Sequence, residues 1–149
     1  MFPLLKYPTF NIRLKQNNAN KLFVFDTIRK KWLLLTPEEW VRQHVVNYLI
    51  TEKKYPAALI SLEKEIELNG TKKRYDIVVY SKDLKPNIII ECKAPEIELS
   101  EQVLEQAQRY NLTLNVNYIF ITNGKMDAVY CDGKLLTNLP AYDELLSGN

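Results

Sequence analysis

Residues 74–93 read RYDIVVYSKDLKPNIIIECK, and this stretch decides the fold. Two runs rich in β-branched and aromatic residues flank the segment SKDLKP, which has turn character. That pattern is typical of an antiparallel β-hairpin. Folding the hairpin about the middle of the turn sets Asp76 opposite the step from Glu91 to Cys92, so the sequence predicts that these residues are neighbours.

Charged side chains come together where the two predicted strands end. Side chains alternate along a strand, so Glu91 and Lys93 share one face and Cys92 takes the other. We therefore expect the carboxylates of Asp76 and Glu91 to converge with the ammonium group of Lys93. Two such acids can hold Mg²⁺ through oxygen ligands, and a neighbouring lysine can orient or activate a metal-bound water. This is the chemistry of phosphodiester hydrolysis.

The alternative is that these charges are ordinary solvated positions at strand ends. The apolar run 88–90, which leads directly into Glu91, favours a site. A strand that apolar is expected to be buried on both faces, and charges at its end then lie at a sheet rim instead of an open surface.

Asp76, Glu91 and Lys93 resemble the PD-(D/E)xK nuclease signature, in which an acid opens one strand and E-x-K closes the next. Further resemblance lies in three segments: TPEEWVRQ at 36–43, QAQRY at 106–110 and YIFITNG at 118–124. Together these motifs are similar to the amino-terminal nuclease domain of the R subunit of type I restriction enzymes, from about residue 33 to residue 130. Tyr75 stands where the signature usually has proline.

The resemblance implies a fold and a set of partners. The expected fold is α/β and restriction-endonuclease-like: a mixed central β-sheet flanked by helices, with an N-terminal β extension. The expected activity is Mg²⁺-dependent endonuclease action on DNA, with Mn²⁺ as a substitute ion. In type I enzymes this domain is fused to a translocase motor and works with further subunits, so restriction-system subunits or a motor protein are expected partners. The alternative is a catalytically weak module that binds DNA or a protein through the same fold.

The resemblance also implies roles for individual residues. Asp76 and Glu91 would ligate the metal, with the Cys92 carbonyl as a further ligand, and Lys93 would position the attacking water. The remaining implied site residues, which orient the lysine or the DNA backbone or support the metal, are Gln106, Tyr110 and Glu39. No G-x-x-x-x-G-K-[ST] loop is present, so we expect a stand-alone relative or a fragment.

Two predicted helices carry the residues whose roles stay open. Thr36 and Pro37 begin a helix that runs to residue 51, and Glu39 completes a capping box there, which is a local role that competes with metal support. Ser100 caps a second helix over 101–112, where Gln106 and Tyr110 are stacked at i, i+4 spacing. That pair is either a half-buried polar edge or, as in RecB-like nucleases that also place Q-x-x-x-Y after E-x-K, directed at the catalytic centre.

The remaining strands are expected from alternation and turn signals. The β extension at 1–35 should hold strands at 11–15, 21–25 and 31–35. A half-buried strand at 58–68 carries glutamates expected to be solvated, and Asn69-Gly70 then makes a hairpin turn. Strands at 116–122 and 128–131 follow, the first beside the Glu91 strand through a crossover.

Composition bounds the remaining possibilities. At 149 residues the chain fits one domain, divided into the β extension 1–35, a catalytic core 36–131 and a tail 132–149. A hydrophobic fraction of 46% and a charged fraction of 26% argue against disorder. The net charge of +2 is too small to identify a nucleic-acid binder. Basic clusters at 29–31, 53–54 and 72–74 either contact phosphates or are solvated turns.

The start of the chain resembles neither a signal peptide nor a membrane span, so a cytoplasmic location and no membrane partner are expected. The two cysteines, Cys92 and Cys131, lack a metal-ligand spacing, and Cys92 is expected to be a core thiol. The single histidine, His44, falls inside the first predicted helix and is expected to be a packing or surface residue.

Overall fold

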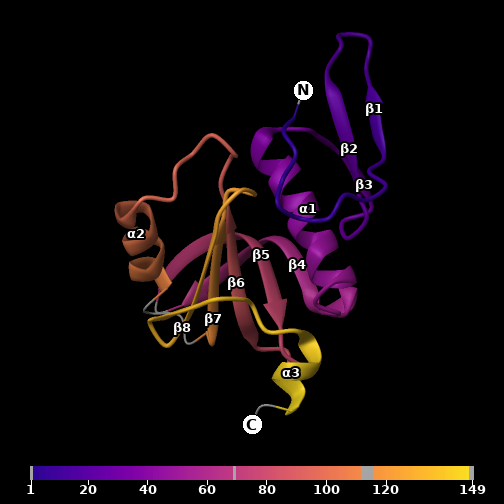
Figure 1. The fold of residues 1–149 in the computed structure, drawn as a ribbon. Helices are drawn as coiled ribbons and strands as arrows, with labels where there is room; N and C mark the ends of the chain where they lie inside the picture. Colours follow the sequence, from indigo (N-terminus) through magenta and orange to yellow (C-terminus); the bar gives the residue numbers. More distant parts are fainter. Residues whose placement is uncertain (1, 69, 112–115, 148–149) are drawn as a thin grey trace.

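The computed structural model describes residues 2–68, 70–111 and 116–147, and these form two sheets and three α-helices (Figure 1). The small antiparallel sheet contains β1 (Leu14–Gln16), β2 (Leu22–Asp26) and β3 (Lys31–Leu34). The large sheet contains β4 (Ile60–Leu68), β5 (Thr71–Tyr80), β6 (Pro86–Cys92), β7 (Tyr118–Thr122), β8 (Asp127–Cys131) and β9 (Lys134–Leu136), in that order. The helices are α1 (Pro37–Thr51), α2 (Glu101–Asn111) and α3 (Tyr142–Ser147), and a 3₁₀ turn lies at Ala57–Leu59.

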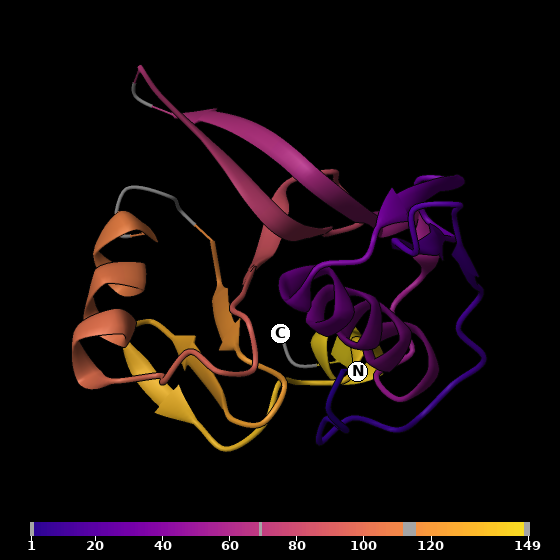
Figure 2. The ribbon, with the colours of Figure 1, turned by 90° about the horizontal axis from the view of Figure 1, so that it is seen from above.

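The large sheet is mixed, as predicted. Its strands pair antiparallel except for β6 and β7, which run parallel and are joined through α2. Helix α1 covers one face of this sheet and α2 the other (Figure 2). Strand β6 is central, and its residues Ile88, Ile89 and Ile90 are fully buried, which confirms the prediction of a strand buried on both faces.

The β5–β6 hairpin has the predicted neighbours. Ile77 pairs with Ile90, so Asp76 comes next to Glu91 across the two strands. The preceding β4–β5 hairpin is long, and its tip projects beyond the sheet (Figure 2). At that tip Gly70 has a φ of +79°, a conformation that glycine adopts without steric cost, whereas Asn69 lies outside the described residues.

An irregularity in β4 and β5 sets the direction of Asp76. The register pairs Leu62 with Ile77 and Lys64 with Tyr75 but skips the positions between them, and Glu63 has a φ of +54°. Ile77 packs on the face of the sheet that α1 covers, so strict alternation would place the preceding residue, Asp76, on the other face. Asp76 instead lies 3.8 Å from a guanidinium nitrogen of α1, so the irregularity turns this carboxylate toward the helix.

The extension and the tail differ in detail from their predictions. β1 starts at residue 14, three residues later than expected, and its three residues, Leu14 to Gln16, all pair with β2. The tail contributes β9 to the edge of the sheet, a strand that was not expected, and ends in the short helix α3. Across the described ranges, every helix lacks the length and apolar character needed to traverse a bilayer.

The start of α1 offers a test of the fold, because this helix carries several site residues. The Thr36 hydroxyl oxygen accepts the backbone N–H of Glu39 at 3.1 Å. Thr36→Ala should lower the free energy of unfolding by about 1 kcal/mol, because that amide loses its cap. Thr36→Ser retains the hydroxyl and should remain close to the wild type in urea unfolding. Equal losses in both variants would show that the hydroxyl does not act as a cap.

Candidate active site

Asp76 lies against the backbone of the E-x-K segment. Its Oδ2 accepts the backbone N–H of Cys92 at 2.8 Å. Burial raises the pKa of the Asp76 carboxyl, and the charges of Glu63 and Glu91 act in the same direction. The Cys92 amide and Arg42 oppose that rise without cancelling it. Asp76 is therefore a carboxylate held at the end of β6, where the cost of burial outweighs the stabilisation that the Cys92 amide and Arg42 provide.

Arg42 of α1 joins three carboxylates. Its guanidinium makes ion pairs with Glu39, at 3.4 Å between Nε and Oε2, with Glu63 and with Asp76. Only 7% of Arg42 is exposed, and its Nε has no hydrogen-bond partner in the part of the chain that the structure describes. Burial alone would lower the pKa of Arg42, but the three carboxylates outweigh it and raise the pKa, so this side chain remains charged.

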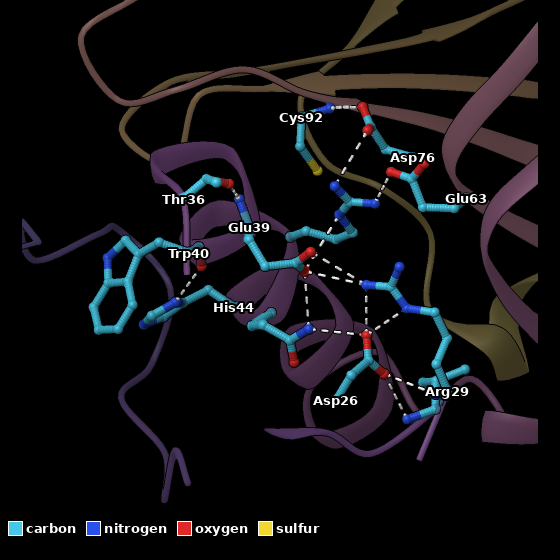
Figure 3. A network of polar contacts seen from close by, with 12 residues as sticks. Asp26, Arg29, Thr36, Glu39, Trp40, His44, Glu63, Asp76 and Cys92 are labelled. Atoms are coloured by element: carbon cyan, nitrogen blue, oxygen red, sulfur yellow. Dashed lines mark hydrogen bonds and ion pairs between the residues drawn. The ribbon is translucent and has the colours of Figure 1, made fainter. Parts of the chain in front are cut away.

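The same network continues into the β extension (Figure 3). Arg29 lies 2.8 Å from Asp26 Oδ2 and 3.2 Å from Glu39 Oε1. Gln43 Nε2 donates to Asp26 and to Glu39, both at 3.0 Å. Asp26 is only 1% exposed, yet the backbone N–H and the guanidinium of Arg29 overcome the effect of burial and lower its pKa. A continuous chain of charges thus runs from β2 through α1 to Asp76.

Glu39 has a different local role from the predicted one. Its backbone N–H is capped by Thr36, as expected, but its carboxylate binds Arg29, Gln43 and Arg42. The capping box is therefore only half formed, because stronger ionic partners hold the glutamate side chain. Arg42 contacts both Glu39 and Asp76, so Glu39 is linked to Asp76 through one intervening side chain. From this position Glu39 supports Asp76 indirectly.

Glu91 and Lys93 occupy the predicted strand end but have other partners. The neighbours of Glu91, Ile90 and Cys92, belong to the core under α1, so alternation puts Glu91 on the opposite face of the sheet. There its Oε1 accepts a hydrogen bond from Lys73 Nζ at 2.9 Å. The structure thus brings the backbones of Asp76 and Glu91 together, but their carboxylates lie on different faces of the sheet, so the convergence of the two acids expected from the sequence is not observed.

The backbone of Lys93 continues the pairing of β6 with β7 by one hydrogen bond, and its ammonium group forms no ion pair within the described residues. Its backbone N–H donates to the Thr122 carbonyl of β7 at 2.8 Å. The side chain is half-buried and has no ion pair among the described residues. A half-buried lysine without a carboxylate partner, beside a strand end that carries two acids, is suited to stabilise an incoming anionic group.

The α2 residues lie farther from this centre. Gln106 is exposed and lines a surface pocket with Gln102, Glu105 and Arg109, all from α2. The opposite side of the helix, with Ala107, packs on β7 and β8. No described contact joins Gln106 to Lys93. The side chain of Tyr110 falls outside the described residues, so the predicted pairing with Gln106 stays a prediction.

One prediction about charged residues is wrong. Glu63 was expected to be solvated, but the backbone irregularity carries it to Arg42 and within 3.8 Å of Arg74. In the basic cluster at 72–74, Lys73 pairs with Glu91, and the exposed Arg74 lies beside Glu63. Phosphate contact by this cluster stays a prediction. Reasoning from sequence also missed Arg42. The available signal was its i, i+3 spacing from Glu39 on the buried side of an amphipathic helix.

The packing roles predicted for His44 and Cys92 are confirmed. His44 is buried between the rings of Phe10 and Trp40, and its Nδ1 lies 2.8 Å from the Trp40 carbonyl oxygen. Cys92 is buried in the main core, and burial raises the pKa of its thiol. Neither residue has the surroundings of a nucleophile or a metal ligand through its side chain.

The donor set at the rim fits a hard divalent cation by its chemistry. Carboxylate and carbonyl oxygens are the ligands Mg²⁺ prefers, and one or two carboxylates commonly suffice because the ion retains waters. A cation beside Asp76 would relieve the desolvation that raises the pKa of this carboxyl. Among the described residues no three His, Cys, Asp or Glu side chains are grouped to hold an ion, so a site here would rest on few protein ligands.

Two of the solved structures similar to this chain, both with a TM-score above 0.5, share its fold. A fragment assigned as an HsdR subunit of a type I restriction enzyme from Vibrio vulnificus YJ016 matches with a TM-score of 0.54 and 22% identity over 75% of this chain and 25% of that one. A DrdV–DNA complex matches with a TM-score of 0.53 and 14% identity over 76% of this chain and 11% of that one. A DUF820 protein from Anabaena variabilis ATCC 29413 gives a TM-score of 0.45 at 12% identity, covering 87% of this chain and 88% of that one.

The chain therefore spans about a quarter of the first of these structures and less of the second. A comparison with curated proteins yields no match. The sequence profile described as "Type I restriction enzyme R protein N terminus (HSDR_N)" matches residues 37–140, which include α1, Asp76, the E-x-K segment and α2. The chain belongs to the family of type I restriction enzyme R protein N termini.

Proposed function

We propose that this chain is a Mg²⁺-dependent DNA endonuclease domain that hydrolyses phosphodiester bonds, with Mn²⁺ as a possible substitute. The observation that carries the proposal is the hydrogen bond from the Cys92 amide to Asp76, which fixes a desolvated acid against the Glu91-Cys92-Lys93 segment. Membership of the R protein family supports it. A half-buried carboxylate with a raised pKa is typical of a functional site, and Lys93 follows Cys92 directly in the chain.

Each residue of the rim has a proposed role. Asp76 would hold the ion with the Cys92 carbonyl as a further ligand, and Glu91 would join them after its side chain leaves Lys73 and turns toward Asp76. Bound Mg²⁺ supplies Lewis-acid stabilisation of the phosphate oxygens. Lys93 would orient the attacking water and offset the negative charge that develops on the phosphoryl group.

Arg42 would hold Asp76 in place and neutralise it until the cation arrives. Glu39 and Glu63, the other two partners of Arg42, would keep its guanidinium in position if the Asp76 side chain rotated to bind a metal ion. Glu91 would in turn exchange Lys73 for the ion, because both bind the same oxygens. Glu39 thus supports the site through Arg42.

The proposed context is restriction or DNA processing in the cytoplasm. The substrate would be DNA, and one structural neighbour is a DrdV–DNA complex. Because the chain spans a quarter of the HsdR fragment it resembles, partner subunits or a motor protein are part of the proposal.

One observation favours a second candidate, a weakly catalytic module that binds DNA or protein. Asp76 and Glu91 already have the cationic partners Arg42 and Lys73, and these pairs compete with a metal. Dependence of DNA cleavage on a divalent ion separates the two candidates, since a binding module requires no such ion.

Lys93→Ala should reduce cleavage of plasmid DNA in Mg²⁺ or Mn²⁺ at least about 100-fold, because the ammonium group stabilises charge that develops only in the transition state. Lys134→Ala removes an exposed lysine of β9 and should leave the rate unchanged. Calcium should permit DNA binding without cleavage, since it occupies the same oxygens with looser geometry. Cleavage at the wild-type rate by a contaminant-free Lys93→Ala protein would place the active site elsewhere.

Two aspartates should respond to pH in opposite directions. The raised pKa of Asp76 means that its charged form disfavours folding, so this cost grows as the pH rises through that pKa. Asp76→Asn should abolish cleavage yet raise the melting temperature at neutral pH in the absence of divalent ions, and the gain should disappear in acid. Circular dichroism melts across a pH series test this.

The matched variant is Asp26→Asn. The lowered pKa of Asp26 stabilises the fold above the ordinary carboxyl range, and that contribution is lost as the pH falls. The variant should lose about 1–3 kcal/mol at neutral pH, because Arg29 and Gln43 keep a weaker acceptor. A loss of stability in Asp76→Asn equal to that in Asp26→Asn would mean that Asp76 is a structural ion-pair partner.

The α2 face provides a separate test. If Gln106 orients Lys93 or the DNA backbone, Gln106→Ala should slow cleavage about 10-fold or more without changing the melting temperature, because the side chain is exposed. Gln102→Ala, one turn earlier on the same exposed surface, should have a smaller effect. Equal rates for both variants and the wild type would assign Gln106 to the solvated surface.

A further inference from the structure

Positive charge is concentrated in the β extension. Residues 1–35 contain seven lysine and arginine residues and one acid, a formal charge of +6. Because the whole chain carries +2, residues 36–149 carry −4. The small net charge of the chain therefore conceals a strongly basic segment attached to an acidic core, and such asymmetry is typical of an electrostatic footprint for a polyanion.

Most of that charge is exposed and unneutralised. The single acid, Asp26, is buried and already paired with Arg29, and Lys6 pairs with Asp127. The other five basic residues of the extension are exposed and form no ion pair within the described ranges: Arg13, Lys15, Lys21, Lys30 and Lys31. A structural role inside the protein therefore accounts for only two of the seven cations.

Aromatic rings hold two of these cations in place. The register of β1–β3 puts Phe25 opposite Trp32, and the rings are 5.3 Å apart. The Arg13 guanidinium lies 4.4 Å from the Phe25 ring, and the Lys15 ammonium lies 4.4 Å from the Trp32 ring. Cation–π contacts of this kind restrict long side chains that would otherwise be disordered in solvent.

The extension is also connected to the candidate active site. Arg29 and Asp26 join it to Glu39, and Arg42 continues the contact to Asp76. In Figure 1 the extension and the end of β6 both lie toward the top of the view. The match to the R protein family begins at residue 37, so this basic segment lies outside the matched residues.

We propose that the sheet β1–β3 is an arm that binds the phosphate backbone of duplex DNA beside the active site. The inference rests on the proposed nuclease function for its choice of partner. Arg13 and Lys15 use the ring faces of Phe25 and Trp32, so those faces are not available for stacking on unpaired bases. The arrangement thus favours phosphate contacts on duplex DNA, which carry affinity without reading sequence.

The test measures binding of the full chain to a short fluorescent DNA duplex over a series of salt concentrations. EDTA excludes cleavage, so binding and catalysis are observed separately. Each phosphate contact contributes about 0.9 to the slope of log affinity against log salt. Arg13→Gln/Lys15→Gln should lower that slope by about 2 and weaken binding equally for duplexes of unrelated sequence.

The matched control is Lys82→Gln/Lys134→Gln, which removes the same charge from exposed positions of the core. It should leave the slope nearly unchanged. Lys30→Gln/Lys31→Gln provides a second variant of the arm that disturbs no ring contact, in case loss of the cation–π pairs unfolds the sheet. It should lower the slope in the same way as the first.

Three results would overturn the proposal. One is a slope that neither arm variant changes, and another is an equal change in the core control. The third is displacement of the duplex by polyglutamate at equal charge concentration, which would indicate an acidic protein surface as the partner. If instead the arm variants bind weakly while cleavage by the full chain survives Lys93→Ala undiminished, the arm is supported and the proposed active site fails.

Discussion

The buried guanidinium of Arg42 is the interaction on which the site depends. It neutralises carboxylates from α1, β4 and β5, and without it each of those acids would lose a cationic partner in surroundings where desolvation is costly. Ion pairs in such surroundings add little net stability, because desolvation offsets their attraction. Removing the Arg42 charge itself would be costly, however, because all three acids share it, so the arrangement fixes where α1 lies on the sheet and where Asp76 points.

The same constraint explains why the β extension and the core behave as one unit. A three-stranded sheet with 3 to 5 residues per strand buries little apolar surface and is marginal alone. Asp26 and Arg29 anchor it to Glu39, and Gln43 adds hydrogen bonds to both acids. The network at the candidate active site therefore also holds the basic segment in a defined position, and ionic contacts cross the boundary near residue 35.

Features set by local physics were predictable from the sequence. The apolar run of β6, the hairpin turn before it and the Thr36 cap lie in short stretches of residues, and they predicted the sheet centre, the Asp76–Glu91 neighbours and the start of α1. The partners of the charged residues were not predictable. Glu63 reaches Arg42 only because its own backbone departs from a regular strand, and Lys73 reaches Glu91 across β5 and β6. Alternation along single strands contains no information about such departures.

In this structure the two acids of the candidate site, Asp76 and Glu91, are each paired with a cationic side chain. Asp76 has Arg42 on one side of the sheet and Glu91 has Lys73 on the other, so each carboxylate is held by a partner that a divalent ion would have to replace or share. The raised pKa of Asp76 shows that this compensation is incomplete on its side. On the proposal that a divalent cation binds here, that ion would gain most from Asp76, and Glu91 would follow, because this second acid must leave a closer ion pair on the opposite face.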